Sequence, residues 1–242
     1  MDLQISGRTA VVTGASRGIG AATVRLLEAE GAHVVGVSRA AGLDVTAPGA
    51  AERIAERTGG PVDILVNNAG TSFAKPLDAL TDADWNGQWE LHVLASMRLM
   101  RAFAPGMAER GWGRIVNVSS SAGKRPSLTN AAYSVTKAAQ LSLSRVFADT
   151  YAARGVLVNA VAPGPVASPL WIDAGGLADQ AAAAAGISRE QAFDAQAARV
   201  PVGRFAAEEE IASVIAFLCF ERASMVAGAA WSVDGGTVAT IV

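Results

Sequence analysis

The segment TAVVTGASRGIG, residues 9–20, decides the fold class of this chain. It begins as a run of β-branched residues, becomes glycine-rich after Thr13, and is followed by apolar side chains at helical spacing. Glycines in such a turn let the backbone bend sharply and approach a diphosphate, which free N–H groups at the helix N-terminus can bind. The segment therefore predicts a strand–turn–helix unit that binds a dinucleotide through Gly14, Gly18 and Gly20. A tight turn that needs no ligand is the structural alternative.

Similar β-branched runs recur along the chain, each followed by a longer stretch rich in Ala, Leu and Glu. Strands that read as continuous apolar runs are buried on both faces, so helices should cover both sides of a parallel sheet. We expect an α/β fold, with a doubly wound parallel sheet of about seven strands in three layers. The runs after the first are HVVGVS (33–38), DILVNNAG (63–70), GRIVNVSS (113–120), VLVNAVAPG (156–164) and AAWSVDGG (229–236).

One connection is unusually short. Four residues separate Arg39, after the second run, from Asp44, which is too few for the helix that normally joins two parallel strands. Either that helix is missing or the third strand is reduced to LDV, residues 43–45. We expect a reduced crossover between strands two and three.

Composition limits the classes of partner. A chain of 242 residues, 51% of them hydrophobic, can bury a full core, and we expect one domain over residues 1–242. A net charge of -2, with acids and bases interspersed, gives no footprint for nucleic acid or a membrane surface. The start MDLQISG lacks a signal peptide's basic region, and no run reaches about 18 apolar residues. We expect a cytoplasmic protein with small-molecule partners, no metal site, and Cys219 as a buried apolar residue.

Tyr133 and Lys137 stand four positions apart in a predicted helix, in a chain with two tyrosines and three lysines. Residues at this spacing share a helix face, and a nearby cation favours the phenolate, so Lys137 is expected to lower the tyrosine pKa. Ser120 follows the strand RIVNV and should lie at its carboxyl end, where its hydroxyl can bind a carbonyl oxygen. The three residues predict a general acid/base site. A serine that only caps a turn is the alternative at position 120.

The end of the second strand bears on which dinucleotide fits. An acid here would bind the adenosine ribose hydroxyls and repel a 2′-phosphate, but the chain has Ser38 and Arg39 instead. Arg17 in the glycine turn adds a second positive group. This pattern favours NADP over NAD, with solvated surface arginines as the alternative.

Six short motifs are distributed over nearly the whole length of the chain, in the order TGASRGIG, NNAG, VSSSAG, YSVTK, NAVAPG and VDGG. Together they resemble the short-chain dehydrogenase/reductase family, which has a Rossmann-like fold. The resemblance implies an NAD(P)-dependent oxidoreductase acting on CH–OH groups, and a homo-oligomer, tetramer or dimer. NADP(H) is the preferred cofactor and NAD(H) is possible.

By residue-wise comparison, the resemblance assigns Ser120 to orient the substrate carbonyl and Tyr133 to give or take the proton. Lys137 would hold the nicotinamide ribose and lower the tyrosine pKa. Asn67 and Asn117 also match, with a role that only ties strands together as the alternative. The expected cofactor-binding residues are Gly14, Ser16, Arg17, Gly18, Ile19, Gly20, Ser38, Arg39, Asp44, Val45, Asn68, Ala69, Gly70, Tyr133, Lys137, Pro163, Gly164 and Val166.

The pattern fails at His92, seven residues after Trp85, where the family usually has an asparagine that shapes a helical bulge and supports a relay water behind the lysine. Three roles for His92 stay open. A bulge carbonyl can still hold that water, a neutral imidazole can join the relay, or the ring can fill a helix interface without catalytic duty.

Residues 170–200 form an alanine-rich insertion after the last Pro-Gly turn, at a position that favours a mobile lid over the substrate. A plain surface helix pair is the alternative. Its apolar residues suggest a hydrophobic or alicyclic substrate, although they can equally pack the lid on the body. They are Leu170, Trp171, Ile172, Leu177 and Phe193.

The leading hypothesis is an NADP(H)-dependent enzyme that interconverts a ketone and a secondary alcohol. A 3-oxoacyl-thioester reductase is a narrower alternative, with Lys124 and Arg125 as a basic patch for an acyl carrier protein. A dinucleotide-binding protein without turnover is the alternative from another class, supported by His92 and opposed by the intact Tyr133 and Lys137 pair.

Overall fold

The computed structural model describes residues 3–239 and has a parallel sheet at its centre. The strand order is β2-β1-β3-β4-β5-β6, so the chain moves outward from β1 to β2 and then returns past β1 to build the other half. This is the doubly wound arrangement expected from the sequence. The strands are β1 (Thr9–Thr13), β2 (His33–Val37), β3 (Ile64–Asn67), β4 (Gly113–Val118), β5 (Val156–Pro163) and β6 (Ala230–Val233).

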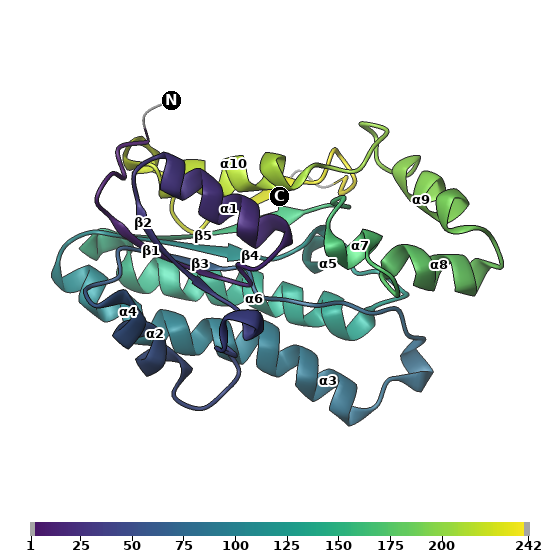
Figure 1. Cartoon of the computed structure of the whole chain (residues 1–242), viewed down its shortest axis with the longest axis horizontal. Coiled ribbons are helices and arrows are strands. Elements are labelled where there is room, and N and C mark those ends of the chain that lie inside the picture. The colour runs from purple at the N-terminus through teal and green to yellow at the C-terminus, as the bar shows by residue number, and fades with distance from the viewer. Residues whose placement is uncertain (1–2, 240–242) are drawn as a thin grey trace.

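Helices cover both faces of the sheet (Figure 1). One layer contains α1 (Gly18–Ala29) and α10 (Glu208–Cys219), which pack on each other. The opposite layer contains α2 (Ala50–Thr58), α3 (Asp82–Trp89), α4 (Ala95–Glu109) and α6 (Ala131–Tyr151). Short α5 (Ser121–Lys124) follows β4, and α7 (Pro169–Ile172), α8 (Leu177–Ala185) and α9 (Arg189–Ala197) project beyond one end of the sheet. The remaining turns are η1 (Arg39–Ala41), η2 (Leu77–Ala79), η3 (Glu90–Leu94), η4 (Ala152–Arg154) and η5 (Glu221–Ala223).

The apolar core lies in two clusters, one on each face of the sheet. Val12 belongs to the cluster that includes Leu27 of α1 and Ile211 of α10. Its neighbour Val11 belongs to the cluster that includes Leu99 of α4. Successive strand residues point to opposite faces, and an uninterrupted apolar strand therefore serves both layers. This explains why the six β-branched runs of the sequence became the six strands.

The ends of β1 and β3 are joined where the direction of strand addition reverses. The Thr13 hydroxyl accepts hydrogen bonds from the backbone N–H groups of Asn68 (2.9 Å) and Ala69 (3.0 Å). The Asn68 amide donates to Thr13 O at 2.9 Å. In doubly wound sheets, ligands bind at this reversal point, and these bonds fix the backbone around it.

The seventh strand is absent from the described residues, because residues 43–45 form a turn. The Asp44 carboxylate accepts hydrogen bonds from the backbone N–H (2.9 Å) and hydroxyl (2.7 Å) of Thr46. Such an Asx turn competes with strand pairing, although Leu43 and Val45 are buried as strand residues would be. Only η1 lies between β2 and this turn, in keeping with the short spacing from Arg39 to Asp44. The helix α2 follows the turn and leads to β3.

Cys219 is fully buried, and burial raises the pKa of its thiol to about 12. It is therefore the buried apolar residue that the sequence predicts. Between residues 3 and 239, the helices are too short or too polar to cross a membrane.

Candidate active site

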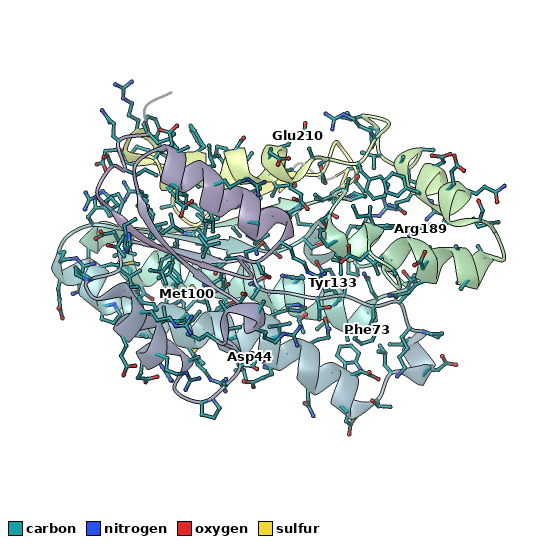
Figure 2. All side chains as sticks on the ribbon, viewed as in Figure 1. Asp44, Phe73, Met100, Tyr133, Arg189 and Glu210 are labelled. Carbon is teal, nitrogen blue, oxygen red and sulfur yellow. The ribbon has the colours of Figure 1, made fainter. Side chains whose placement is uncertain are left out.

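Ser120, Tyr133 and Lys137 converge where β4 ends and α6 begins. Tyr133 lies in the first turn of α6, in the part of the molecule nearest α7 and α8 (Figure 2). The Lys137 Nζ lies 5.6 Å from the centroid of the Tyr133 ring. The helical spacing of the pair thus places both side chains on one face, as expected.

Ser120 has two contacts. Its Oγ accepts a hydrogen bond from Ala122 N (3.1 Å) and caps α5. The side chain also interacts with the Tyr133 phenol and opposes the rise in its pKa that burial causes. The capping alternative is therefore correct but incomplete, because the same hydroxyl contacts the tyrosine.

Lys137 is buried, with 3% of its surface exposed. Its Nζ donates to Val118 O (2.8 Å) and to Gln140 Oε1 (3.1 Å). The neighbouring Ser119 hydroxyl donates to Lys137 O (2.9 Å) and holds α6 against the end of β4. An ammonium has three donors, so two fixed acceptors leave one N–H for another partner.

Burial changes the acid–base properties of the pair. It raises the pKa of the Tyr133 phenol, which the interaction with Ser120 opposes, and it lowers the pKa of Lys137 to about 7. The expectation that Lys137 lowers the tyrosine pKa is wrong for this structure, because removal of both groups from water disfavours their charged forms. At neutral pH, Tyr133 is a protonated phenol and therefore a proton donor.

His92 lies in η3, a π-helical turn in which the backbone N–H of Ala95 donates to Glu90 O. The helical bulge implied by the family pattern is thus present with histidine in place of asparagine. Such bulges are often found at functional sites. The His92 ring packs edge-on against Tyr133, with centroids 5.4 Å apart.

Both nitrogens of the fully buried His92 ring have partners. Nε2 accepts from Thr71 N (3.2 Å), and Nδ1 lies 2.9 Å from the hydroxyl of Thr136. Thr136 donates to Tyr133 O, so the Nδ1–H tautomer completes the chain of donors and acceptors. Burial, followed by the charge of Lys137, lowers the pKa of His92 well below its usual 6.5. Among the three open roles, the contacts favour a neutral ring that ties the loop after β3 to α6.

The glycine turn is shaped by close backbone packing. Gly14 and Gly18 have positive φ angles of 66° and 63°. A Cβ at Gly20 would lie 2.2 Å from Gly14 O and 2.5 Å from Asn68 Nδ2. Within the described chain, no side chain caps α1 and its first turn holds no acid. This uncapped N-terminus fits a phosphate group.

The other residues of this turn differ in their surroundings. Ser16 is exposed, whereas Ile19 packs partly buried against the core, so Ile19 has a structural role as well. Arg17 forms an ion pair with Asp173 (2.6 Å) in the segment that follows α7. The guanidinium expected at a cofactor phosphate is thus joined here to the 170–200 segment.

The loop after β2 brings Ser38 and Asp44 together. The Ser38 hydroxyl caps η1 by accepting from Ala41 N (3.1 Å), and Leu43 N donates to Ser38 O (3.0 Å). The hydrogen bonds from Thr46 lower the pKa of Asp44, as does the nearby charge of Arg39. Val45 is buried. Arg39 is exposed at the sheet edge.

Gly70 and the turn after β5 both pack closely against neighbouring residues. A Cβ at Gly70 would meet His92 Nε2 at 3.3 Å and Lys137 Nζ at 3.6 Å, which places this loop against both side chains. At Gly164, a Cβ would lie 2.8 Å from the Cα of Asp234. Pro163 ends β5 and Val166 is buried.

Asn67 and Asn117 connect buried strands. Asn67 Nδ2 donates to Asn117 Oδ1 at 2.8 Å, and Asn117 Nδ2 donates to Ser144 Oγ of α6 at 2.8 Å. Their role of tying strands together is confirmed.

The 170–200 segment packs against the body through aromatic rings. Phe193 stacks on Phe205 with centroids 3.9 Å apart, and Trp171 contacts the same ring edge-on at 5.0 Å. These two residues therefore hold the segment in place. The Gln180 side chain also accepts from Ala74 N (2.7 Å), in the loop after β3.

Sequence reasoning missed three residues of this site. Gln140, Thr71 and Thr136 contact Lys137 or His92 directly. Gln140 stands three positions after Lys137, on the same helix face. This spacing of an amide from Lys137 was the only feature of the sequence that could have indicated Gln140. The partners of the two threonines come from distant elements and leave no local pattern.

Comparison with known proteins agrees with this geometry. A family model described as enoyl-(acyl carrier protein) reductase matches residues 36–238. L-xylulose reductase of Bos taurus is 38% identical over 99% of this chain and all of its own. Cis-4-hydroxycyclohexanecarboxylate dehydrogenase of Sinomonas cyclohexanicum is 40% identical over 96% of this chain and 97% of its own. The crystal structure of L-sorbose reductase from Gluconobacter frateurii, complexed with NADPH and L-sorbose, covers both chains fully with a TM-score of 0.90 and 33% identity. The chain therefore belongs to the short-chain dehydrogenase/reductase family and is an NAD(P)-dependent oxidoreductase that acts on CH–OH groups.

Proposed function

We propose that this protein interconverts a ketone and a secondary alcohol with NADP(H), and that Ser120, Tyr133 and Lys137 are its catalytic residues. The observation that carries the proposal is that Ser120 interacts with the Tyr133 phenol, while the buried Lys137 ammonium lies 5.6 Å from the centroid of the same ring. In the reducing direction, bound NADPH would supply a hydride to the carbonyl carbon. Tyr133 donates its phenolic proton to the carbonyl oxygen, and Ser120 donates a hydrogen bond to that oxygen. The raised pKa of Tyr133 supports its role as the acid in this direction.

Lys137 has a separate role in this proposal. One backbone acceptor, Val118 O, and one side-chain acceptor, Gln140 Oε1, fix the ammonium. The remaining N–H is available to the nicotinamide ribose. The uncapped N-terminus of α1, with Gly14, Gly18 and Gly20, would hold the diphosphate. Asn68, Ala69 and Gly70 would border the ribose from the end of β3.

The preference for NADP over NAD rests on the end of β2. Ser38 replaces the acid that would repel a 2′-phosphate, and Arg39 is exposed beside it. The L-sorbose reductase structure, which contains NADPH, supports the same cofactor. Arg17 is the second positive group, and Asp173 competes for it.

We further propose that residues 170–200 form a lid over an alicyclic ketone. Two contacts support a closed position of this segment. Ala74 N, in the loop after β3, donates to Gln180, and Arg17, in the glycine turn, forms an ion pair with Asp173. The 40% identity to a dehydrogenase of a hydroxycyclohexane acid supports an alicyclic substrate. Leu170, Ile172 and Leu177 remain the apolar candidates, because Trp171 and Phe193 pack on Phe205.

The proposed function is tested by the oxidation of NADPH and NADH with a panel of substituted cyclohexanones, L-xylulose and a 3-oxoacyl thioester. Faster turnover of the cyclic ketones with NADPH is the expected result. No turnover of any member, despite NADPH binding, would instead favour a protein that only binds the dinucleotide.

The Tyr133→Phe variant gives the sharper result. It keeps the ring against His92 but lacks the proton donor, so we expect turnover to fall by about 10²-fold or more, with the dissociation constant of NADPH unchanged. Fluorescence of bound NADPH measures that constant. Wild-type turnover in this variant would refute the proposed role.

Reduction of a thioester on an acyl carrier protein is disfavoured by the contacts of Lys124. Its Nζ donates to Ala230 O (2.6 Å) and Ser232 Oγ (3.0 Å), which binds α5 to β6. Lys124 is thus held against β6, and Arg125 is the more exposed of the two basic side chains.

We also propose that the protein is a single domain, forms a homo-oligomer and is cytoplasmic. Exposed apolar side chains on the helical layer, such as Val135 (47% exposed) and Val146 (57% exposed) of α6, support association between copies. Sedimentation of the purified protein tests the oligomeric state.

A further inference from the structure

Gln140 contacts the active-site lysine but is absent from the three proposed catalytic residues. It lies in α6, one turn beyond Lys137, and is fully buried. Its Oε1 accepts from Lys137 Nζ at 3.1 Å, and its Nε2 donates to Ser96 Oγ of α4 at 3.1 Å. Because an ammonium only donates, the amide oxygen must face the lysine. Both ends of the Gln140 amide are thus used within the protein.

We infer that Gln140 is a positioning residue that holds the Lys137 ammonium in place and favours its charged form. The contact is a charge-assisted hydrogen bond in a buried place, where such bonds are strong. The second acceptor, Val118 O, comes from the end of β4. The two acceptors, one on β4 and one on α6, leave the third N–H of Lys137 for another partner.

The other ionisable groups around Lys137 do not supply this stabilisation. His92, on η3, is neutral and has both nitrogens bonded, and Tyr133, on α6, is a protonated phenol. Lys124, on α5, is bound to β6. Burial lowers the pKa of Lys137 to about 7, so loss of one acceptor would leave the ammonium less stable still.

Two substitutions at Gln140 should move the Lys137 pKa in opposite directions. Gln140→Leu removes the acceptor and should lower that pKa by about one unit, the size of a hydrogen bond to a charged group. Gln140→Glu places a carboxylate in its stead and should raise it by at least as much. A residue that only filled space would not give shifts of opposite sign.

The pKa can be measured directly, because the chain has only three lysines. Carbon-13 labelling at lysine Cε gives three signals, and Lys137→Met identifies the one to follow through a pH titration. Ser144→Ala is the matched control: it removes a buried hydroxyl of α6 that bonds Gln140 O and Asn117 but does not contact Lys137. It should leave the Lys137 titration unchanged.

The role of Gln140 in turnover rests on the proposed function, whereas the titration does not. In an active enzyme, the alkaline limb of kcat/KM should move to lower pH in Gln140→Leu and to higher pH in Gln140→Glu. If no variant turns over any ketone, the proposed function fails while the titration still reports on Gln140. An unchanged Lys137 pKa in Gln140→Leu would overturn the inference. If that variant does not fold, Ser96→Ala tests the inference instead. It removes the acceptor for Gln140 Nε2, so the amide is held less firmly and the pKa of Lys137 should fall by a smaller amount.

Discussion

At the scale of single residues, His92 shows how burial decides a chemical role. Its ring accepts from Thr71, pairs with the hydroxyl of Thr136 and lies against Tyr133. A relay of protons through this ring would have to break one of these bonds. The loop after β3 would then lose the connection to α6 that runs through His92. The neutral ring therefore has a positioning role: it helps to hold the loop that contains Gly70 and the Tyr133 side chain in place.

We predict that His92 stays neutral from pH 8 to 5.5. Burial and the charge of Lys137 hold its pKa well below 6.5, so protonation would begin only in more acidic solution. Because the chain has two histidines, the ring signals in a proton–carbon NMR titration can be assigned with His92→Asn. A His92 signal that titrates near pH 6.5 would contradict the neutral, fully bonded ring.

The sequence located the residues of this site better than it predicted their acid–base properties. Ser120, Tyr133 and Lys137 could be found because their spacing and strand ends are local features. The direction of the Tyr133 pKa could not, because desolvation depends on all the elements packed around the phenol. The contact of Gln140 with Lys137 is local, but the bond that orients its amide comes from Ser96 on α4, 44 residues away, and leaves no local pattern.

At the scale of elements, the same limit applies to the third strand. The six strands were predicted because each is an apolar run buried on both faces. Leu43 and Val45 carry a similar pattern, but the side chain of Asp44 bonds Thr46 and closes a turn. A local side-chain hydrogen bond thus prevailed over the hydrophobic pattern.

The contact between α8 and the loop after β3 gives a prediction at this scale. Gln180→Ala removes the acceptor for Ala74 N, which should weaken the closed position of residues 170–200 by about 1 kcal/mol. We expect KM for the ketone to rise about fivefold, as that energy implies, and the dissociation constant of NADPH to stay the same.

Asp194→Ala, at an exposed position of α9, is the control for Gln180→Ala and should leave both constants unchanged. Steady-state kinetics and fluorescence titration measure them. If Gln180→Ala changed NADPH binding alone, the segment would belong with the cofactor rather than the ketone.

At the scale of the whole molecule, burial of the charged Lys137 side chain lowers the free energy of unfolding. Its pKa is about 7 in the folded chain and near 10.5 in water. Between these values the unfolded chain binds the proton that the folded chain has lost. The unfolding free energy therefore rises with pH in this window, by up to about 1.4 kcal/mol per unit from this one group.

The difference in unfolding free energy between the wild type and Lys137→Met isolates that contribution, because all other ionisable groups are common to both. We expect the difference to change little below pH 7, where Lys137 is protonated in both states. Above pH 7 it should rise in favour of the wild type and level off near pH 10. Urea unfolding at a series of pH values measures it without reference to any substrate. A difference that stayed constant from pH 6 to 10 would mean that Lys137 keeps its ordinary pKa and that its ammonium is not desolvated.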